Sequence, residues 1–174
     1  MSATAARAGL SFWVQWVAAG VVGLAIGVGL LLTLSKVLGG PPHKAIMGAV
    51  AGGSVGTLQW LALRRRGIRA PWWVAASMLA WGVGAPAEYV GGLTLAIAVL
   101  AVLAGILQSL ALRGVVPRSH WWFAANVVAW AVFLGTVQLT SQLPSPAMGI
   151  GVGFALVAVI TGLAMMWLLR ALAK

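Results

Sequence analysis

The chain has 174 residues, of which 62% are hydrophobic and only 7% are charged, and its mean hydropathy is +1.04. A soluble domain carries roughly 25% charged residues, so this composition excludes a water-soluble globule, a disordered chain and a nucleic-acid-binding domain. The net charge of +10 comes from 11 lysines and arginines against one acid, Glu88, a balance that is typical of a membrane orientation signal. Cysteine is absent from the sequence, which excludes disulfides and cysteine-ligated metals.

Six stretches are long and apolar enough to cross a bilayer core of about 30 Å, which needs roughly 20 residues in a helix. The first is too long for the apolar part of a signal peptide and is predicted to remain as a transmembrane helix. The third is the shortest, and Pro86 and Glu88 are predicted to end it. The sequence thus predicts an all-α integral membrane protein, with residues 1–174 as a single transmembrane domain. The predicted helices cover residues 10–34, 45–63, 71–85, 90–112, 121–139 and 147–169.

The positive charges are distributed unevenly between the predicted loops, and this indicates how the helices are oriented. With a cytoplasmic N-terminus, nine lysines and arginines lie inside and only Lys36 and Lys44 lie outside. All the loops are short, which is the condition under which positive charge sets the orientation. We therefore expect a multi-pass protein of the bacterial cytoplasmic (inner) membrane with both termini in the cytoplasm. The inside residues are Arg7, Arg64, Arg65, Arg66, Arg69, Arg113, Arg118, Arg170 and Lys174.

Part of the chain is repeated. Residues 56–81 and 105–130 align without a gap at an offset of 49, with 14 identities in 26 positions. Each copy is a predicted helical hairpin, in which one helix ends at an arginine, a short basic turn follows, and the next helix begins with a tryptophan pair. Both copies enter the membrane from the same side, so they are parallel repeats. A possible third copy is split across the termini, with the helix that ends at Arg170 followed by the helix that begins near Phe12-Trp13.

The motifs of this repeat carry a resemblance. The pattern G-x-L-Q-W-L-x-L-R-R from Gly56, followed by the tryptophan pair at Trp72, resembles a group of uncharacterised multi-pass membrane proteins of cyanobacteria and green filamentous bacteria. The resemblance covers the four central predicted helices and implies a multi-pass membrane protein without a particular chemistry. The second copy departs from the pattern, with Ser109 in place of the tryptophan and Gly114 in place of the second arginine.

Four glutamines lie within the predicted spans, namely Gln15, Gln59, Gln108 and Gln138. An unpaired amide in hydrocarbon costs several kcal/mol, so each is expected to hydrogen-bond a neighbouring helix. Gln59 and Gln108 are equivalent in the repeat, and we expect them at equivalent places in two superimposable hairpins. The amides either hold helices together or, if they converge, line a site for a ligand or substrate.

The tryptophans of the repeat fall at two depths. Each copy has a pair at the expected cytoplasmic surface, where the amphipathic indole favours the headgroup layer, and these pairs are predicted to be interfacial anchors. Each copy also has a single tryptophan eight or nine residues further along, which belongs either to the packed core or to the wall of a pigment or quinone site. The pairs are Trp72-Trp73 and Trp121-Trp122, and the deeper residues are Trp81 and Trp130.

Arginines and glycines follow regular patterns of their own. The arginines near the predicted cytoplasmic surface set the topology and are also candidates for contact with anionic lipid headgroups or an acidic partner. Glycines recur every fourth residue in three predicted helices, a spacing that predicts close helix packing. The arginines are Arg64, Arg65, Arg66, Arg69, Arg113 and Arg118, and the glycines are Gly23 and Gly27, then Gly48, Gly52 and Gly56, then Gly149 and Gly153.

The single acid, Glu88, follows Pro86 near the outer end of the predicted helix 90–112. A carboxylate at a helix start can cap the free N–H groups there, and this is the role that we predict for it. The alternative is a buried ionisable side chain that faces a cavity and pairs with Lys44.

For function, the near absence of acids matters most. With one acid and no Ser-His-Asp set, carboxylate pair or metal cluster, the sequence does not predict an enzyme. We expect a non-catalytic polytopic membrane protein, either an accessory or scaffolding subunit of a membrane complex or a homo-oligomer, whose partners are membrane lipids, other subunits or copies of itself. The alternatives are a small transporter or channel and, given ten tryptophans and the resemblance, a protein that binds carotenoid, quinone or chlorophyll. No cofactor is predicted.

Overall fold

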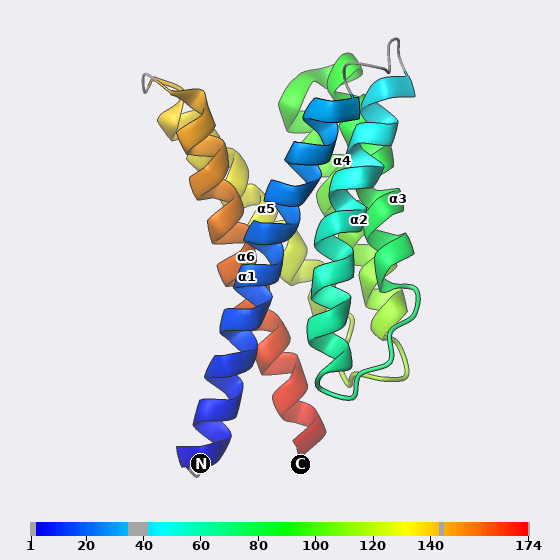
Figure 1. Cartoon of the computed structure of the whole chain (residues 1–174), viewed down its shortest axis with the longest axis vertical. Coiled ribbons are helices and arrows are strands. Elements are labelled where there is room, and N and C mark those ends of the chain that lie inside the picture. The colour runs from blue at the N-terminus through cyan, green and yellow to red at the C-terminus, as the bar shows by residue number, and fades with distance from the viewer. Residues whose placement is uncertain (1–2, 35–41, 143–144, 174) are drawn as a thin grey trace.

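The computed structural model describes residues 3–34, 42–142 and 145–173, and every regular element in these ranges is a helix. The helices stand side by side in an elongated bundle, with the N- and C-terminal ends at the same end of it (Figure 1). Lys36 and Lys174, which were counted for the orientation, lie outside the described residues. In chain order the elements are α1 (Ala3–Leu34), α2 (Pro42–Arg64), α3 (Trp73–Gly84), the 3-10 helix η1 (Ala85–Ala87), α4 (Glu88–Leu112), α5 (Trp121–Thr140), α6 (Pro146–Arg170) and the 3-10 helix η2 (Ala171–Ala173).

In the part of the chain that the structure describes, five helical segments are long and apolar enough to cross a membrane, which indicates a membrane-embedded, multi-pass protein. Helix α1 begins at Ala3, earlier than the predicted start at residue 10. The alanines in this added part favour helix although they lie outside the strongly apolar stretch. The five segments are Gly9–Leu30, His43–Arg64, Trp73–Leu112, Trp121–Thr140 and Ala147–Arg170.

The segment Trp73–Leu112 is the longest because α3, η1 and α4 follow one another without a loop. It does not run straight through the bundle. Ser77 of α3 is bonded to Gln108 of α4, whereas Gly84 of α3 packs against Leu100 of α4. As the chain advances along α3, its contacts therefore move back along α4, and the two helices are antiparallel.

Helix α3 ends at Gly84, next to the predicted end at residue 85, but the chain reverses at Gly91 and Gly92 rather than at Pro86. The backbone stays in the right-handed helical region on both sides of Pro86, which sits in the single turn of η1. Proline is tolerated in the first turn of a helix because the N–H that it lacks would have no partner there. Gly91 then leaves the helical region, and Gly92 takes φ = 67°, a value that only glycine adopts without strain.

The predicted capping role of Glu88 is also wrong, because this residue lies before the break, in the last turn of the helical run that begins with α3. Its carboxylate Oε2 accepts a hydrogen bond from Lys44 Nζ at 2.5 Å, and the same ammonium lies 4.5 Å from the centre of the Tyr89 ring. A negative charge is disfavoured at a helix C-terminus, so Lys44 compensates for its position. With 46% of the side chain exposed, Glu88 is not a buried group either, although it does have the partner that the alternative named.

The ion pair links the start of α2 to the helical run before Gly91, and its strength can be measured. In a double-mutant cycle with Lys44→Gln and Glu88→Gln, we expect a coupling of about 0.2–1 kcal/mol, because both side chains are partly exposed. The free energy of unfolding in detergent micelles gives the coupling, which should shrink as the salt concentration rises. Zero coupling at low salt would contradict the link.

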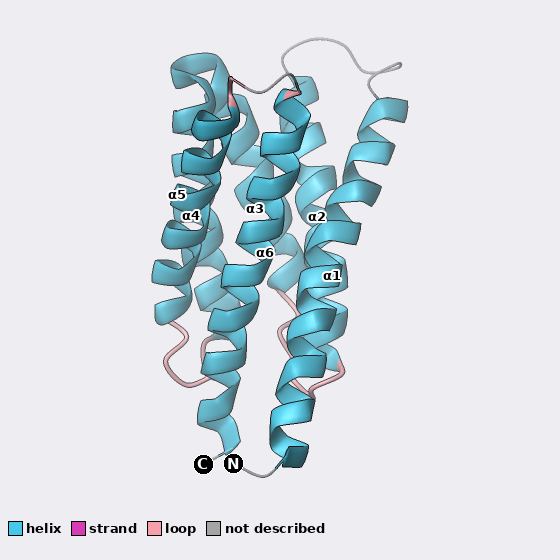
Figure 2. Cartoon of the chain, turned by 90° about the vertical axis from the view of Figure 1, so that its left-hand side faces the viewer, coloured by secondary structure: helices cyan, strands magenta, loops and turns pink. Residues whose placement is uncertain are grey.

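The helices form a closed ring. Each one packs against its neighbours in sequence, α1 closes the ring against α6, and no other pair of the α-helices is in close backbone contact within the described ranges. Figure 2 shows the two terminal ends together, with the α2–α3 and α4–α5 loops at that same end. The buried residues of the bundle thus gather around a central axis.

Glycines allow the helices of the ring to approach closely, as their spacing predicts. A Cβ atom on Gly23 of α1 would lie 2.7 Å from Val55 Cα of α2, and one on Gly52 of α2 would lie 2.5 Å from the Ser77 carbonyl oxygen of α3. Real Cβ atoms do not make contacts this short, so any side chain here would push the helices apart. A Cβ atom on Gly29, in contrast, would have no neighbour within 4 Å.

Two alanine substitutions on α1 test this packing. Gly23→Ala should lower the free energy of unfolding by about 1–3 kcal/mol, because the α2 backbone has to move away. Gly29→Ala is the matched control and should be neutral or stabilise the protein by up to roughly 1 kcal/mol through its helix propensity. Thermal unfolding followed by circular dichroism measures both, and equal effects would contradict the role of the close approach.

Candidate functional site

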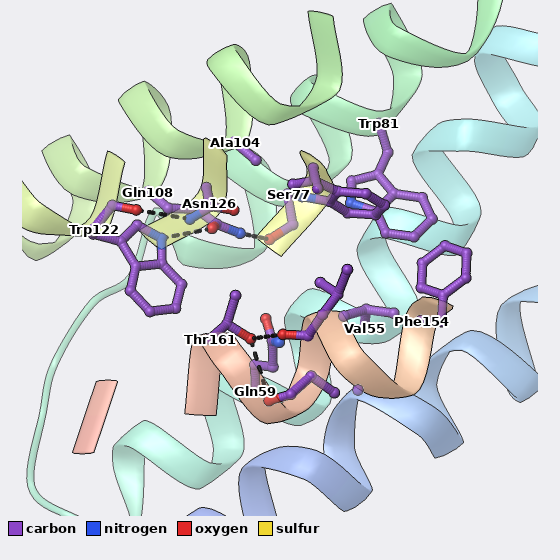
Figure 3. Close-up of a pocket in the computed structure, with 14 residues that line it drawn as sticks. Val55, Gln59, Ser77, Trp81, Ala104, Gln108, Trp122, Asn126, Phe154 and Thr161 are labelled. Atoms are coloured by element: carbon purple, nitrogen blue, oxygen red, sulfur yellow. Dashed lines mark hydrogen bonds between the residues drawn. The ribbon is translucent and has the colours of Figure 1, made fainter. Parts of the chain in front are cut away.

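Five polar side chains are buried in the described part of the chain, and all five line one cavity of about 40 Å³. They come from α2, α3, α4, α5 and α6, so the cavity lies on the axis of the ring (Figure 3). A cavity of this size has room for roughly two or three water molecules. The five residues are Gln59, Ser77, Gln108, Asn126 and Thr161. We call them the polar layer.

Two helices contribute to the polar layer in the same way. In α3, Trp73, Ser77 and Trp81 are each four residues apart, and in α5 the tryptophan, polar residue and tryptophan recur at the same spacing. Residues four apart lie on one face of a helix, so each helix presents its polar residue between two indoles. The members of the second stripe are Trp122, Asn126 and Trp130, each 49 positions after its counterpart.

Gln108 holds three helices together from within the polar layer. Its Oε1 accepts a hydrogen bond from Trp122 Nε1 of α5 at 2.8 Å, and its Nε2 donates to Ser77 Oγ of α3 at 2.9 Å. Ser77 in turn donates to the Trp73 carbonyl oxygen at 2.9 Å, and Asn126 Nδ2 donates to the Trp122 carbonyl oxygen at 3.0 Å. Gln108 therefore behaves as the sequence predicts for an amide inside a membrane protein.

Gln59 is buried as well, with 8% of its surface exposed, but its amide bonds no residue in the described ranges. On the other side of the cavity, Trp16 Nε1 of α1 donates to Thr161 Oγ1 of α6 at 3.2 Å, and Thr161 donates to the Val157 carbonyl oxygen at 2.7 Å. The buried Trp73 Nε1 also finds no partner there. The side chains around Gln108 and Thr161 are thus hydrogen-bonded, whereas the Gln59 amide has no bonding partner within the described ranges.

Three fully buried tryptophans pack together on the side of the polar layer nearest the chain ends. Trp16, Trp73 and Trp122 lie in mutual contact, with ring centroids 5.5–5.8 Å apart. The prediction that Trp73 and Trp122 are interfacial anchors is wrong. Their sequence neighbours Trp72 and Trp121 are 72% and 53% exposed and fit that role. Successive helix residues point about 100° apart, so one indole of each pair faces outward and the other faces the axis.

A second aromatic cluster lies on the opposite side of the polar layer. The deeper tryptophans of the two copies, Trp81 and Trp130, have ring centroids 5.7 Å apart, and both rings contact Phe154 of α6. Phe133 completes the cluster against Trp130 and Phe154. These rings fill the core with one another, and Trp81, Trp130 and Phe154 also form part of the wall of the small cavity.

The other two glutamines do not join the polar layer. Gln15 Nε2 donates to Ser11 Oγ at 3.4 Å within α1, so the prediction that it bonds a neighbouring helix is wrong, and its side chain lines an outer groove between α1 and α2. Gln138 is exposed on α5. Only the repeated pair, Gln59 and Gln108, therefore reaches the axis. The predicted superposition of their two hairpins remains a prediction.

The charged side chains avoid the interior. The described arginines from Arg64 to Arg170 are exposed, at or just beyond the ends of α2, α4 and α6 that lie near the chain ends. Some rest on aromatic rings, with Arg64 over Trp60 at 4.8 Å. No group of three or more His, Cys, Asp or Glu residues that could hold a metal ion occurs in the described ranges. The candidate site is thus an uncharged cavity lined by amides, hydroxyls and indoles. The arginines are Arg64, Arg65, Arg66, Arg69, Arg113, Arg118 and Arg170.

Sequence reasoning did not identify three members of the polar layer, namely Ser77, Asn126 and Thr161, or the buried Trp16. A signal for two of them was present, because Ser77 and Asn126 are both small and polar and lie 49 positions apart. A comparison of the two copies that counts only identical residues does not detect this pair. Trp16 and Thr161 lie outside the two aligned copies, so only the closure of α1 against α6 brings them to the axis.

No family model matches this chain, and neither a curated protein nor a solved structure is detectably similar to it.

The bonds of Gln108 make a direct prediction. Gln108→Leu should lower the free energy of unfolding by about 1–3 kcal/mol, because Trp122 Nε1 and Ser77 Oγ lose their buried partner. Gln138→Leu, at an exposed position of α5, is the control and should change it by less than about 0.5 kcal/mol. Thermal unfolding in micelles compares the two. A Gln108 variant as stable as the Gln138 variant would contradict the network.

Proposed function

We propose that this chain is a non-catalytic, polytopic protein of the bacterial cytoplasmic membrane that acts by association, as an accessory or scaffolding subunit of a membrane complex or as a homo-oligomer. One observation carries the proposal. The polar layer, which is the only group of buried polar side chains in the described ranges, is covered along the axis by aromatic clusters on both sides. Such an interior favours a rigid body over a passage for solutes.

A small transporter or channel receives less support from this geometry. On α3 the indoles of Trp73 and Trp81 lie one turn either side of Ser77, about 6 Å along the helix in each direction. A solute that moved along the axis would have to separate packed rings at both points. The described charged side chains lie at the ends of the bundle, so no chain of ionisable groups marks a route for ions or protons.

Carotenoid, quinone or chlorophyll binding also receives less support. A cavity that binds a single benzene ring has a volume of about 150 Å³. The cavity beside Trp81 and Trp130 has about 40 Å³, and their rings are already packed against Phe154. A pigment would have to bind on the outside of the bundle.

Membrane lipids are proposed as partners, and one groove favours anionic headgroups. A groove of about 430 Å³ lies at the end of the bundle that carries the chain ends, with Arg118 and Arg170 beside the half-exposed Trp167. Two guanidinium groups and an indole at a membrane surface suit a phosphate headgroup. Lipid contact of this kind fits a subunit embedded in a complex.

We further propose six membrane crossings, built from tandem hairpin repeats, with both termini in the cytoplasm. The antiparallel course of α3 and α4 supports separate crossings for these two helices. The arginines whose exposure the structure describes lie at the end of the bundle that carries the chain ends, and Lys44 lies at the other, which is the distribution expected for a cytoplasmic N-terminus.

Cysteine labelling tests this orientation, since the natural chain has no cysteine. In Ser145→Cys, at the start of α6, a membrane-impermeant maleimide should react from outside intact cells. In Ser119→Cys, in the α4–α5 loop, it should react only after the cells are opened. The reverse pattern would overturn the proposed orientation, and labelling of both from one side would overturn the six crossings.

Association itself is tested on the protein released from its own membrane. Native mass spectrometry in mild detergent and in lipid nanodiscs should show an assembly of fixed stoichiometry, heavier than the 17.9 kDa chain. In vesicles, energy transfer between differently labelled copies should persist on a tenfold dilution with lipid if the assembly is a homo-oligomer. A monomer in both preparations, without energy transfer in vesicles, would overturn the proposal.

A further inference from the structure

Grooves on the outside of the ring support a third copy of the repeat. Grooves of similar size, about 260 and 240 Å³, lie between α1 and α2 and between α3 and α4. Ala18 and Ala19 in the first groove have counterparts 57 positions later in the second, and Leu61 has a counterpart 49 positions later. The counterparts are Ala75, Ala76 and Leu110. The packing of α1 against α2 therefore corresponds to the packing of α3 against α4.

The same correspondence between helices holds for the residues on the axis of the ring. The same shift of 57 pairs Trp16 with Trp73, and the repeat offset pairs Trp73 with Trp122, which together are the three tryptophans in mutual contact. Helix α6 followed in space by α1 is thus a third hairpin, and it aligns through Trp16 rather than through the predicted Phe12-Trp13. The three hairpins are α2–α3, α4–α5 and α6–α1.

The third hairpin lacks the polar residues of the other two. Its glycine Gly162 corresponds to Gly56 and Gly105, so Met165 stands where the other hairpins have a glutamine. The shift of 57 places Gly20 where they have Ser77 and Asn126. Gly20 lines the cavity, while Met165 is fully buried beside the three tryptophans.

This difference accounts for the unbonded Gln59. Gln108 of one hairpin donates to Ser77 of the hairpin before it in the ring. The corresponding partner for Gln59 lies on the hairpin before its own, at Gly20, which has no side chain. Gln59 therefore faces the cavity with a donor and an acceptor unused, and the cavity lies where a third polar side chain is missing.

We propose that this cavity is a binding site for a neutral molecule of the size of water that both donates and accepts hydrogen bonds, and that water occupies it in the membrane. The volume of about 40 Å³ sets the size. The lining sets the charge, because amides, hydroxyls and indoles surround the cavity and no charged side chain lies on it. A buried water needs two to four polar partners, which Gln59, Asn126 and Thr161 can supply.

Replacing Gln59 distinguishes an occupied cavity from an empty one by the sign of the effect. Gln59→Met introduces the residue type that the third hairpin has at this position. If water bonds the amide, the variant loses those bonds and its Tm should fall by roughly 2–4 °C. If the cavity is empty, the variant removes an unsatisfied buried amide and its Tm should rise, which would overturn the proposal. Gln108→Met is the matched control and should lower the Tm in either case.

A second measurement observes the bound molecule in the unaltered protein. In nuclear magnetic resonance spectra of the isotope-labelled protein in micelles, the Gln59 side-chain amide protons should show cross-relaxation with a long-lived water. Gly20→Ser combined with Ala158→Gly should abolish this signal, because the new hydroxyl fills the cavity. The second change is needed since a Cβ atom on Gly20 would lie 2.9 Å from Ala158 Cβ.

Ala158→Gly alone is the control for this pair and should keep the signal. Absence of the signal in the unaltered protein would overturn the proposal. A signal that persists in the double variant would place the water elsewhere and would overturn it as well.

Discussion

The structure depends on the rule that an amide inside a membrane protein cannot be left without hydrogen-bond partners, because the surrounding lipid supplies none. Gln108 obeys this rule by bonding α3 and α5 at once, through Ser77 and Trp122. These bonds fix how far the three helices slide and how they rotate relative to one another. Apolar packing alone would tolerate several such arrangements, since lipid tails are as apolar as the side chains that they would replace.

Aromatic and small residues account for the rest of the packing between the helices. Lipid gives little hydrophobic drive for helices to associate, so stability comes from close fit. Glycines such as Gly23 and Gly52 bring neighbouring backbones together at the rim of the ring. On the axis, where the helices leave more space, the large indoles of Trp16, Trp73 and Trp122 fill it. Residue size thus increases from the contacts between neighbours toward the centre.

The sequence predicts the helical stretches well, because a bilayer demands long apolar runs and those runs are visible in composition. It also identifies Gln59 and Gln108 as polar residues within the predicted spans, since such residues are conspicuous in apolar runs. It does not predict which indole of a pair faces the axis, because Trp72 and Trp73 differ only by the rotation of their helix. The error at Glu88 has a similar cause, since proline is a strong breaker in general but is tolerated in a first turn.

The closure of the ring by α1 and α6 has a consequence for how the protein is made. A ribosome delivers the helices in order, so α1 enters the membrane well before its neighbour α6. Until α6 is made, the indole of Trp16 therefore lacks its hydroxyl partner, Thr161. The arrival of α6 supplies this partner and closes the ring against α1, and the buried indoles of Trp16, Trp73 and Trp122 are then separated from lipid.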